Sequence, residues 1–309
     1  PFYYTGNGAA QVMARKTTPE VIFNNVMQHK VTIMHMAPTV LNALMQYYEN
    51  EVPAVNQRLR VIVAGSAPPP AFVTRVEKEL GWEFIQVYGM TEASPIIAIS
   101  RVRSQFKEMP LNEQYKMKAK AGYQLIGSDV RVVDENGDEV EKDGKSIGEV
   151  ITRGHGVMKG YWKNEEETMR TIQNGWLQTG DMGTVDEYGN LDIVDRKKDV
   201  IISGGENISS IEVEGNLYEH PAVLEAAVIA VPHEKWGETP HAFIVVRPNH
   251  IVTESELITF SRNSLAHFKA ITGVTFVDEL PKTASGKIQK VELRNNYWEA
   301  EGKTGRFVN

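Results

Sequence analysis

The chain of 309 residues contains no cysteine. This absence excludes disulfide bonds, thiolate metal sites and a cysteine nucleophile. The chain also lacks a long apolar run, because the longest, at residues 226–231, is far short of the roughly 20 residues that a membrane-spanning helix needs. Neither sign of charge is in large excess: 33 lysines and arginines oppose 40 aspartates and glutamates, giving a formal charge of −7. Bulk attraction to nucleic acid or to an acidic membrane is therefore disfavoured.

What the chain does contain is the composition of an ordinary globular protein. Hydrophobic residues make up 41% of it and charged residues 24%, which argues against disorder, collagen-like sequence and a coiled coil. At about 150 residues per domain, the length predicts about two domains. We expect a cytoplasmic protein with no nucleic-acid partner and no membrane span, and leave homo-oligomerisation open.

Helical and extended patterns alternate through the first hundred residues. Pro19 and Pro38 each begin a segment with apolar residues at helical spacing. The nearly continuous apolar run 59–64 is typical of a strand covered on both faces. The helical pattern 72–80 then leads to a further predicted strand at 83–87. Strand, helix and strand in this order predict a parallel sheet in an α/β layer.

Short strands with tight turns predominate in the next part of the chain. Turn residues at 134–137 and 187–190 predict hairpins, which favours a small β-barrel or an antiparallel layer. From Asp195 onward helical and extended patterns mix again. The pattern Thr253-x-x-Glu256 fits a capping box at the start of a helix.

Two glycine-containing segments, Gly65-Ser66-Ala67 and Tyr88-Gly89-Met90-Thr91-Glu92, follow predicted strands at their C-terminal ends. Ligands of open α/β sheets bind at this edge. Glycine allows close approach of the backbone, while a threonine hydroxyl and a glutamate suit phosphate oxygen and a cation such as Mg²⁺. Each segment taken alone is equally compatible with an ordinary turn.

Three later segments carry weaker signals. Asp181 follows Gly180 and could accept the hydroxyls of a ribose or simply end a turn. The five charges at 195–199 fit either a solvated surface or a hinge. Lys287 ends a loop that lacks the glycine spacing of a Walker loop, and it could meet a phosphate or only solvent. We assign no role to three histidines without partners at metal-ligand spacing: His35, His155 and His233.

In their order along the chain and in their residues, these segments resemble the motifs of the adenylate-forming superfamily, which includes acyl-CoA synthetases, peptide-synthetase adenylation domains and luciferases. The matching residues are 63–68, 87–92, 148–150, 160–162, 175–176, 180–181, 195–199, 203–208, 280–283 and 286–287. Residues 201–208 and 276–283 read most like fatty acyl-CoA ligases. The alternatives are an enzyme that passes its acyl group to a carrier protein, an aryl-CoA ligase, and a non-catalytic binding module.

The resemblance implies a ligase that uses ATP, Mg²⁺ and coenzyme A with a fatty carboxylate. The carboxylate attacks ATP to give acyl-AMP and pyrophosphate, and the thiol of coenzyme A then displaces AMP. A carboxylic acid of pKa about 4 to 5 is already ionised at neutral pH, so the first step needs no general base. It needs cations that offset the charge at phosphorus.

The resemblance also implies site residues. Lys287, Thr91 and Glu92 would be catalytic, with Glu92 holding Mg²⁺ and Lys287 reaching the α-phosphate. Asp181 would accept the ribose hydroxyls, and Arg196 would assist there. The predicted nucleotide-binding set is Gly65, Ser66, Ala67, Gln86, Val87, Tyr88, Gly89, Met90, Thr91, Asp181, Ile193, Arg196 and Lys287. Lys198 would be the hinge, and Gly204 and Gly205 would border a pantetheine tunnel that a side chain on Gly205 would narrow.

The Ser/Thr/Gly-rich loop that grips the β- and γ-phosphates in this superfamily has no counterpart in these 309 residues. We therefore expect the C-terminal part of a protein of about 500 residues. The expected fold is α/β and α+β. Residues 1–195 would be part of the large domain, with an α/β layer at 1–120 and a barrel-like portion at 121–195, and 196–309 would form a mobile C-terminal domain.

Overall fold

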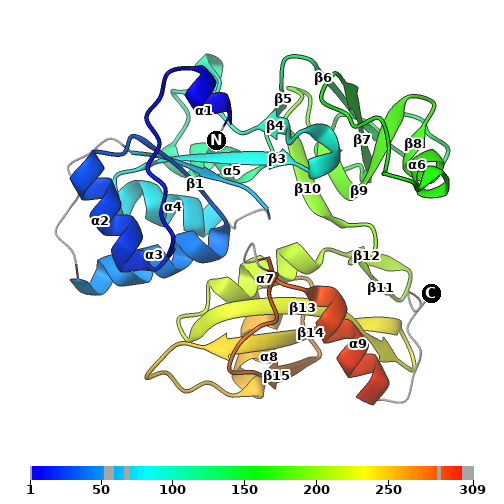
Figure 1. Cartoon of the computed structure of the whole chain (residues 1–309). Helices are drawn as coiled ribbons and strands as arrows, with labels where there is room; N and C mark the ends of the chain where they lie inside the picture. Colours follow the sequence, from blue (N-terminus) through cyan, green and yellow to red (C-terminus); the bar gives the residue numbers. More distant parts are fainter. Residues whose placement is uncertain (1, 52–58, 66–69, 284–286, 301–309) are drawn as a thin grey trace. The chain divides into compact units, whose positions relative to one another are not determined.

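A computed structural model describes residues 2–51, 59–65, 70–283 and 287–300 (Figure 1). The chain divides into two compact units. The first unit comprises Pro1–Val87 and Ser100–Ala119, and the second comprises Tyr88–Ile99 and Lys120–Asn309. The expected domain boundary at residue 195 falls inside the second unit and stays a prediction.

The first unit contains a parallel sheet with helices packed against it. Its strands are β1 (Ile33–Met36), β2 (Arg60–Val63) and β3 (Glu83–Gly89), whose last two residues belong to the second unit. Its helices are α1 (Phe2–Gly6), α2 (Pro19–His29), α3 (Pro38–Glu51), α4 (Pro70–Glu79), α5 (Leu111–Ala119) and the 3-10 turn η2 (Ser104–Phe106). Strands β1, β2 and β3 pair in parallel, which confirms the predicted α/β layer.

The core of the first unit comes from the apolar residues that set the sequence pattern. Val61 of β2 and Phe84 of β3 are buried against Leu44 of α3, Val73 of α4 and Tyr115 of α5. Each helix thus contributes one apolar stripe to the sheet, as an amphipathic helix of a globular domain does. This packing holds the ends of β2 and β3 in register.

Antiparallel strands form the next part of the chain, in the second unit. They are β4 (Ile96–Ile99), β5 (Tyr123–Gln124), β6 (Ser128–Val133), β7 (Gly148–Gly154), β8 (Ile172–Gln173), β9 (Trp176–Val185) and β10 (Leu191–Arg196), accompanied by η1 (Thr91–Ala93) and α6 (Glu165–Thr171). Strand β4 pairs with β5, and β10, β9, β7 and β6 are neighbours in that order, with β8 beside β9. Both predicted hairpin turns join neighbouring strand segments, so the antiparallel layer is confirmed.

The remaining strands and helices form a mixed layer. The strands are β11 (Ile201–Ser203), β12 (Glu206–Ile208), β13 (Val223–His233), β14 (Gly237–Val246) and β15 (Gly273–Phe276), and the helices are α7 (Ser210–Tyr218), α8 (Glu254–Ser264) and α9 (Lys290–Ala300). Thr253 and Glu256 form the predicted capping box of α8. Strand β15 runs parallel to β14, whereas β11 and β13 pair with β14 in the antiparallel sense.

Both faces of the long hairpin β13–β14 are buried. Val228 and Ile244 face a core shared with α7 and α8, whereas their neighbours Ile229 and Phe243 face a second core that includes Leu293 of α9. Side chains alternate along a strand, so consecutive apolar residues fill both cores. Helix α9 accordingly packs against β13 (Figure 1).

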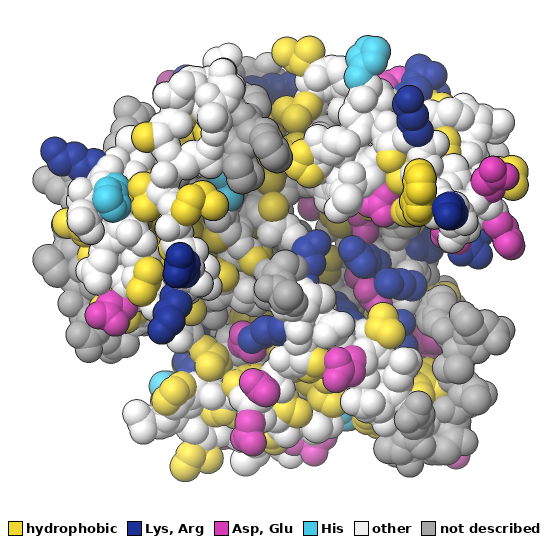
Figure 2. All heavy atoms as spheres, viewed as in Figure 1, with side chains coloured by type: hydrophobic (Ala, Val, Ile, Leu, Met, Phe, Trp, Pro, Cys, Tyr) yellow, Lys and Arg dark blue, Asp and Glu magenta, His cyan; other side chains and the backbone are white. Residues whose placement is uncertain are grey.

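On the face shown in Figure 2, lysine and arginine side chains occur beside aspartate and glutamate over much of the surface. Within the described residues, no helix is both long and apolar enough to cross a membrane.

Candidate functional site

The ends of β2 and β3 place the first predicted site residues side by side. Val63 pairs with Gln86, so Gly65 and Gln86 lie at the C-terminal edge of neighbouring parallel strands. Gly65 has a φ of +113°, a backbone conformation that favours glycine. Gln86 and Val87 are buried, which leaves little of either side chain exposed. The predicted Ser66 and Ala67 fall outside the described residues.

A tight turn follows β3 and requires glycine at position 89. A Cβ on Gly89 would lie 1.9 Å from the carbonyl oxygen of Pro95, so no side chain fits without moving the backbone. This close approach leads the chain into the 3-10 turn η1, which carries Thr91 and Glu92. Thr91 is exposed there, and Met90 before it is extended and half-buried.

Tyr88 and Asp181 meet within the second unit. The Tyr88 hydroxyl donates a hydrogen bond to Asp181 Oδ2 at 2.7 Å. Burial, together with the charge of Asp181, raises the pKa of Tyr88, so the hydroxyl keeps its proton and remains a donor. Asp181 lies on β9 and is 8% exposed. Each carboxylate oxygen has two lone pairs, so Asp181 keeps acceptor capacity for further hydroxyl donors.

Cations lie around Asp181. Arg196 stands opposite Asp181 in the β9–β10 pairing, and its Nε is 3.6 Å from Asp181 Oδ1. The Arg196 side chain is 53% exposed, so it can also contact a ligand. Burial raises the pKa of Asp181, while the Tyr88 hydrogen bond and the charges of Arg196 and Lys287 oppose that rise. The structure thus brings the predicted ribose carboxylate, arginine and lysine into one electrostatic neighbourhood.

Two hydrogen bonds join Lys287 to Thr283. The Thr283 N–H donates to the Lys287 carbonyl at 2.8 Å, and the Lys287 N–H donates to Thr283 Oγ1 at 3.2 Å. Within the described residues Lys287 makes no ion pair, and it is exposed. Its ammonium is therefore available to an anionic ligand.

Glu92 is held by a segment far away in sequence. The Tyr161 hydroxyl donates to Glu92 Oε1 at 2.9 Å, and the Met158 N–H donates to the Glu92 carbonyl at 2.7 Å. The Tyr161 N–H in turn donates to Thr168 Oγ1 of α6. One carboxylate oxygen of Glu92 is therefore fixed, and the other can bind a cation.

Within the described residues, no three histidine, aspartate or glutamate side chains gather as a metal cluster. In proteins, Mg²⁺ is usually bound by one or two carboxylates together with phosphates of the substrate. Glu92 therefore fits the expected Mg²⁺, provided that phosphate oxygens complete its coordination.

In the charged segment 195–199, the residue that precedes the predicted hinge Lys198 is bonded to neighbouring strands. The Lys197 N–H donates to the Gly180 carbonyl at 2.8 Å, and Lys197 Nζ lies 2.8 Å from Glu149 Oε2. Glu149 also accepts from the Gly180 N–H at 3.2 Å. Lys198 itself is exposed. Lys197, the residue before Lys198, is thus bonded to β7 and β9.

The predicted nucleotide-binding residue Ile193 lies on β10 and is half-buried.

Gly204 and Gly205 differ in their surroundings. A Cβ on Gly204 would lie 2.9 Å from Cε3 of Trp236, whereas a Cβ on Gly205 would meet nothing within 4 Å. Both have positive φ, +59° and +89°. The glycine whose missing side chain leaves room for a neighbour in this structure is therefore Gly204, and that neighbour is an indole ring. At Gly205 the backbone conformation is what favours glycine.

Comparison with known proteins decides the family. Residues 1–162 match the family described as AMP-binding enzyme, and residues 212–287 match the AMP-binding enzyme C-terminal domain. The chain belongs to the AMP-binding enzyme family. This confirms the resemblance inferred from the motifs.

The relatives of this AMP-binding enzyme include CoA ligases. It is 40% identical over 289 residues to the peroxisomal trans-cinnamate:CoA ligase of Petunia hybrida, covering 93% of this chain and 50% of the relative. It is 39% identical over 293 residues to a peroxisomal butyrate–CoA ligase of Arabidopsis thaliana, covering 93% of this chain and 51% of the relative. The chain spans about half the length of these relatives.

Among solved structures, the chain is similar to the anthranilate CoA ligase AuaEII in complex with anthranoyl-AMP. The TM-score is 0.84 and the identity 30%, with 96% of this chain and 56% of that chain covered. The expected fold, a large domain followed by a small C-terminal one, agrees with this likeness.

The sequence patterns did not single out three residues that contact predicted site residues or the segments beside them. Tyr161 was recognised only as part of a motif, Glu149 likewise, and Trp236 carried no signal at all. Their partners lie 69, 31 and 32 residues away, as the pairs Tyr161–Glu92, Glu149–Gly180 and Trp236–Gly204 show. No periodicity or spacing relates residues this far apart.

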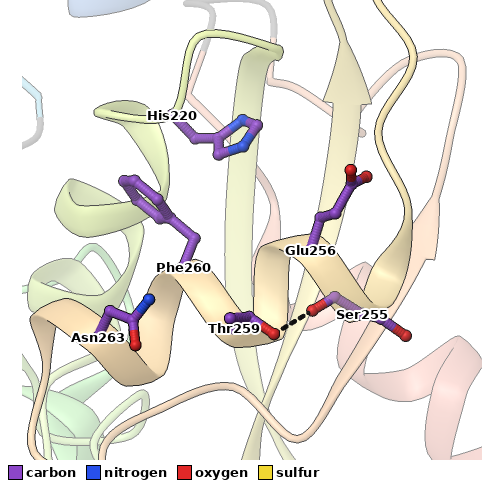
Figure 3. A pocket seen from close by; sticks show the side chains of 6 residues that line it. All are labelled: His220, Ser255, Glu256, Thr259, Phe260 and Asn263. Carbon is purple, nitrogen blue, oxygen red and sulfur yellow. Dashed lines mark hydrogen bonds between the residues drawn. The ribbon is translucent and has the colours of Figure 1, made fainter.

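A surface pocket of about 440 Å³ lies elsewhere, on α8, and none of the predicted site residues lines it (Figure 3). Three of its polar side chains have partners within the protein. The Thr259 hydroxyl donates to the Ser255 carbonyl, Glu256 belongs to the capping box, and His220 Nδ1 accepts from the Ala222 N–H. We assign this pocket no part in nucleotide binding.

Proposed function

We propose that the whole protein containing this chain is an acyl-CoA ligase. It would activate a fatty carboxylate with ATP to acyl-AMP and pyrophosphate, and then transfer the acyl group to coenzyme A. The observation that carries this proposal is the grouping of Asp181, Tyr88, Arg196 and Lys287 in a member of the AMP-binding enzyme family.

In the first half-reaction, Asp181 would accept hydrogen bonds from the ribose hydroxyls. The Tyr88 hydroxyl orients the Asp181 carboxylate, which suits it to receive two more donors. Arg196 and Lys287 would offset negative charge on the phosphates as it accumulates at phosphorus. The substrate carboxylate is ionised at neutral pH, so none of these side chains has to remove a proton from it.

Glu92 and the phosphates of the substrate would hold Mg²⁺. When bound, such an ion neutralises phosphate charge. The contribution of this chain is to orient the Glu92 carboxylate through Tyr161. Thr91, exposed beside Glu92, would contact the α-phosphate with its hydroxyl.

In the second half-reaction, we propose that the C-terminal residues rotate about Lys198 and that Gly204 and Gly205 border the pantetheine arm. The exposure of the Lys198 side chain supports a hinge at this residue. The indole of Trp236 against Gly204 would form part of the same wall.

The substrate class has two candidates. Residues 201–208 and 276–283 favour a fatty acid, and the name of the butyrate–CoA ligase relative agrees with an alkyl acid. A second candidate is an aryl-CoA ligase, since the names of the trans-cinnamate:CoA ligase and the anthranilate CoA ligase specify aromatic acids.

A substrate panel tests the proposal. The full-length protein is supplied with ATP, Mg²⁺, coenzyme A and either butyrate, a longer fatty acid, cinnamate or benzoate, and free acyl-CoA is measured by chromatography. Formation of a fatty acyl-CoA supports the proposal, and exclusive use of cinnamate or benzoate supports the aryl candidate. Acyl-AMP formation without release of any acyl-CoA would overturn both and point to a carrier-protein acceptor.

The compartment is a separate question. Two relatives are named as peroxisomal, whereas we expected a cytoplasmic protein. Fluorescence microscopy of the tagged full-length protein, beside a peroxisomal marker, distinguishes the two locations.

A further inference from the structure

Four polar residues, two of them buried and two partly buried, lie together beside the predicted hinge. Lys290 Nζ, at the start of α9, lies 2.7 Å from Glu214 Oε1 and 2.5 Å from the Ser210 hydroxyl, both of α7. The Lys290 and Glu214 side chains are only 15% and 14% exposed. We call Asp195, Ser210, Glu214 and Lys290 the hinge cluster.

Asp195 connects β10 to this cluster. It is 1% exposed, and its Oδ2 accepts a 2.5 Å hydrogen bond from the Ser210 N–H. A second hydrogen bond joins the same two segments: the Ser209 hydroxyl donates to the Val194 carbonyl at 2.5 Å. The last residues of β10 are therefore fastened to the N-terminal end of α7.

The charges of the cluster depend on one another. Burial disfavours an ammonium, yet the Glu214 and Asp195 carboxylates outweigh that effect and raise the pKa of Lys290. Lys290 is thus a largely buried cation that pairs with Glu214 and is stabilised by the charge of Asp195. Removing it would leave those carboxylates buried without their cation, which is far costlier than losing a surface ion pair.

A second buried ion pair fastens the other side of the hinge. Arg294 of α9 contacts Asp199 Oδ1, and both side chains are about nine-tenths buried. Asp195 precedes Lys198 and Asp199 follows it. The exposed Lys198 therefore lies between two anchored residues.

We propose that Lys290 is a positioning residue that sets where Lys287 stands during acyl-AMP formation, an inference that rests on the proposed function. Three residues span at most about 11 Å, so fixing Lys290 against α7 confines Lys287 to a small volume. In this structure the volume is close enough to Asp181 for the charge of Lys287 to lower the pKa of the Asp181 carboxyl.

The hinge cluster should matter for only one half-reaction. Asp195 lies before Lys198, whereas Ser210, Glu214 and Lys290 lie after it. Rotation about Lys198 would separate Asp195 from the other three, while the contacts of Lys290 with Glu214 and Ser210 would persist. The complete cluster belongs to the arrangement in which Lys287 faces the nucleotide residues, so it should favour adenylation over thioester formation.

The test replaces Lys290 in the full-length protein and measures the two half-reactions separately. For Lys290→Met we expect acyl-dependent pyrophosphate release to fall about 10- to 100-fold, the range that a misplacement of about 1 Å costs. Conversion of supplied acyl-AMP to acyl-CoA should stay within about twofold. Lys290→Arg should restore much of the lost adenylation, because it returns a cation to the cluster.

The matched control is Lys269→Met. Lys269 also pairs with a glutamate of α7, Glu212, at 2.8 Å, but it lies outside the hinge cluster. We expect this control to leave both half-reactions unchanged. A Lys290→Met protein that loses both half-reactions equally, or neither, would overturn the proposal.

A second readout does not depend on activity. Trypsin cleaves after Arg196, Lys197 and Lys198. Loosening the hinge cluster should expose this segment and speed its cleavage, and mass spectrometry measures the cleavage rate. We expect faster cleavage in Lys290→Met than in Lys269→Met, and equal rates would overturn the proposal. If Lys290→Met fails to fold, Ser210→Ala, which removes one acceptor of Lys290, should give the same asymmetry in smaller measure.

The wild-type protein separates this proposal from the proposed function. Absence of both half-reactions in the wild type would overturn the acyl-CoA ligase. The trypsin comparison would still decide whether Lys290 holds the hinge.

Discussion

Tyr161 donates a hydrogen bond to Glu92 across 69 residues of sequence, at 2.9 Å. A main-chain hydrogen bond from Met158 to the Glu92 carbonyl runs beside it. A loop on the antiparallel layer thereby orients the carboxylate that we expect to hold Mg²⁺.

Tyr161→Phe should weaken adenylation and raise the Mg²⁺ concentration needed for half-maximal rate. A hydrogen bond to a charged group is worth about 1.5–3 kcal/mol, so the rate at limiting Mg²⁺ should fall about 10- to 100-fold. Pyrophosphate release against Mg²⁺ concentration measures this. Trp162→Phe is the control, since Trp162 is 88% exposed. An unchanged Mg²⁺ dependence would show that Tyr161 does not orient Glu92.

Gly204→Ala should destabilise the chain by a steric effect that Gly205→Ala lacks. Both substitutions carry a backbone cost of about 1 kcal/mol at positive φ, but only the Cβ on Gly204 meets Trp236. Urea unfolding of the two variants, with and without Trp236→Ala, isolates the steric part. Trp236→Ala should recover stability in the Gly204→Ala background and not in the Gly205→Ala background; equal recovery in both would contradict the contact.

Lys287→Ala should separate the half-reactions of the full-length enzyme. Adenylation should fall by about 100-fold or more, because the lysine offsets charge only as it accumulates at phosphorus. Transfer of the acyl group from supplied acyl-AMP to coenzyme A should be largely kept. Lys282→Ala is a nearby control, since Lys282 pairs with Glu225 at 2.7 Å. Equal loss of both steps would remove Lys287 from its assigned role.

Asp181→Asn should stabilise the fold more at pH 8 than at pH 4.5. Burial raises the pKa of Asp181 in the folded chain, so the folded state binds its proton more tightly than the unfolded state does. Ionisation of Asp181 therefore lowers stability as pH rises through that raised pKa, and asparagine escapes this penalty. Urea unfolding of both proteins at the two pH values tests the sign. A stability difference that stays constant or shrinks with pH would contradict it.

The 309-residue chain by itself should bind nucleotide weakly and should not adenylate. Its sequence contains no Ser/Thr/Gly-rich loop of the kind that holds the β- and γ-phosphates in the superfamily. Isothermal titration with AMP and an acyl-dependent pyrophosphate exchange assay measure the two claims. Measurable exchange by this chain would refute the prediction.

Much of the fold could be predicted from local sequence patterns. Pro19 at the first position of α2 and the capping box of Thr253 act within a few residues, so the helix starts they predict appear in the structure. The apolar run of β2 likewise forms a strand of the parallel sheet, because a strand buried on both faces needs apolar residues in succession.

The sequence by itself predicted the main helices and strands, the family resemblance and the charged residues that we propose for the site. Only the tertiary structure decided which of them meet. Glu92 with Tyr161, Gly204 with Trp236, and Ser210 with Lys290 are brought together by packing of distant segments. Local propensity acts over a turn of helix or a hairpin. Burial of a carboxylate depends instead on every segment that covers it, and no short sequence pattern encodes which distant segments these are.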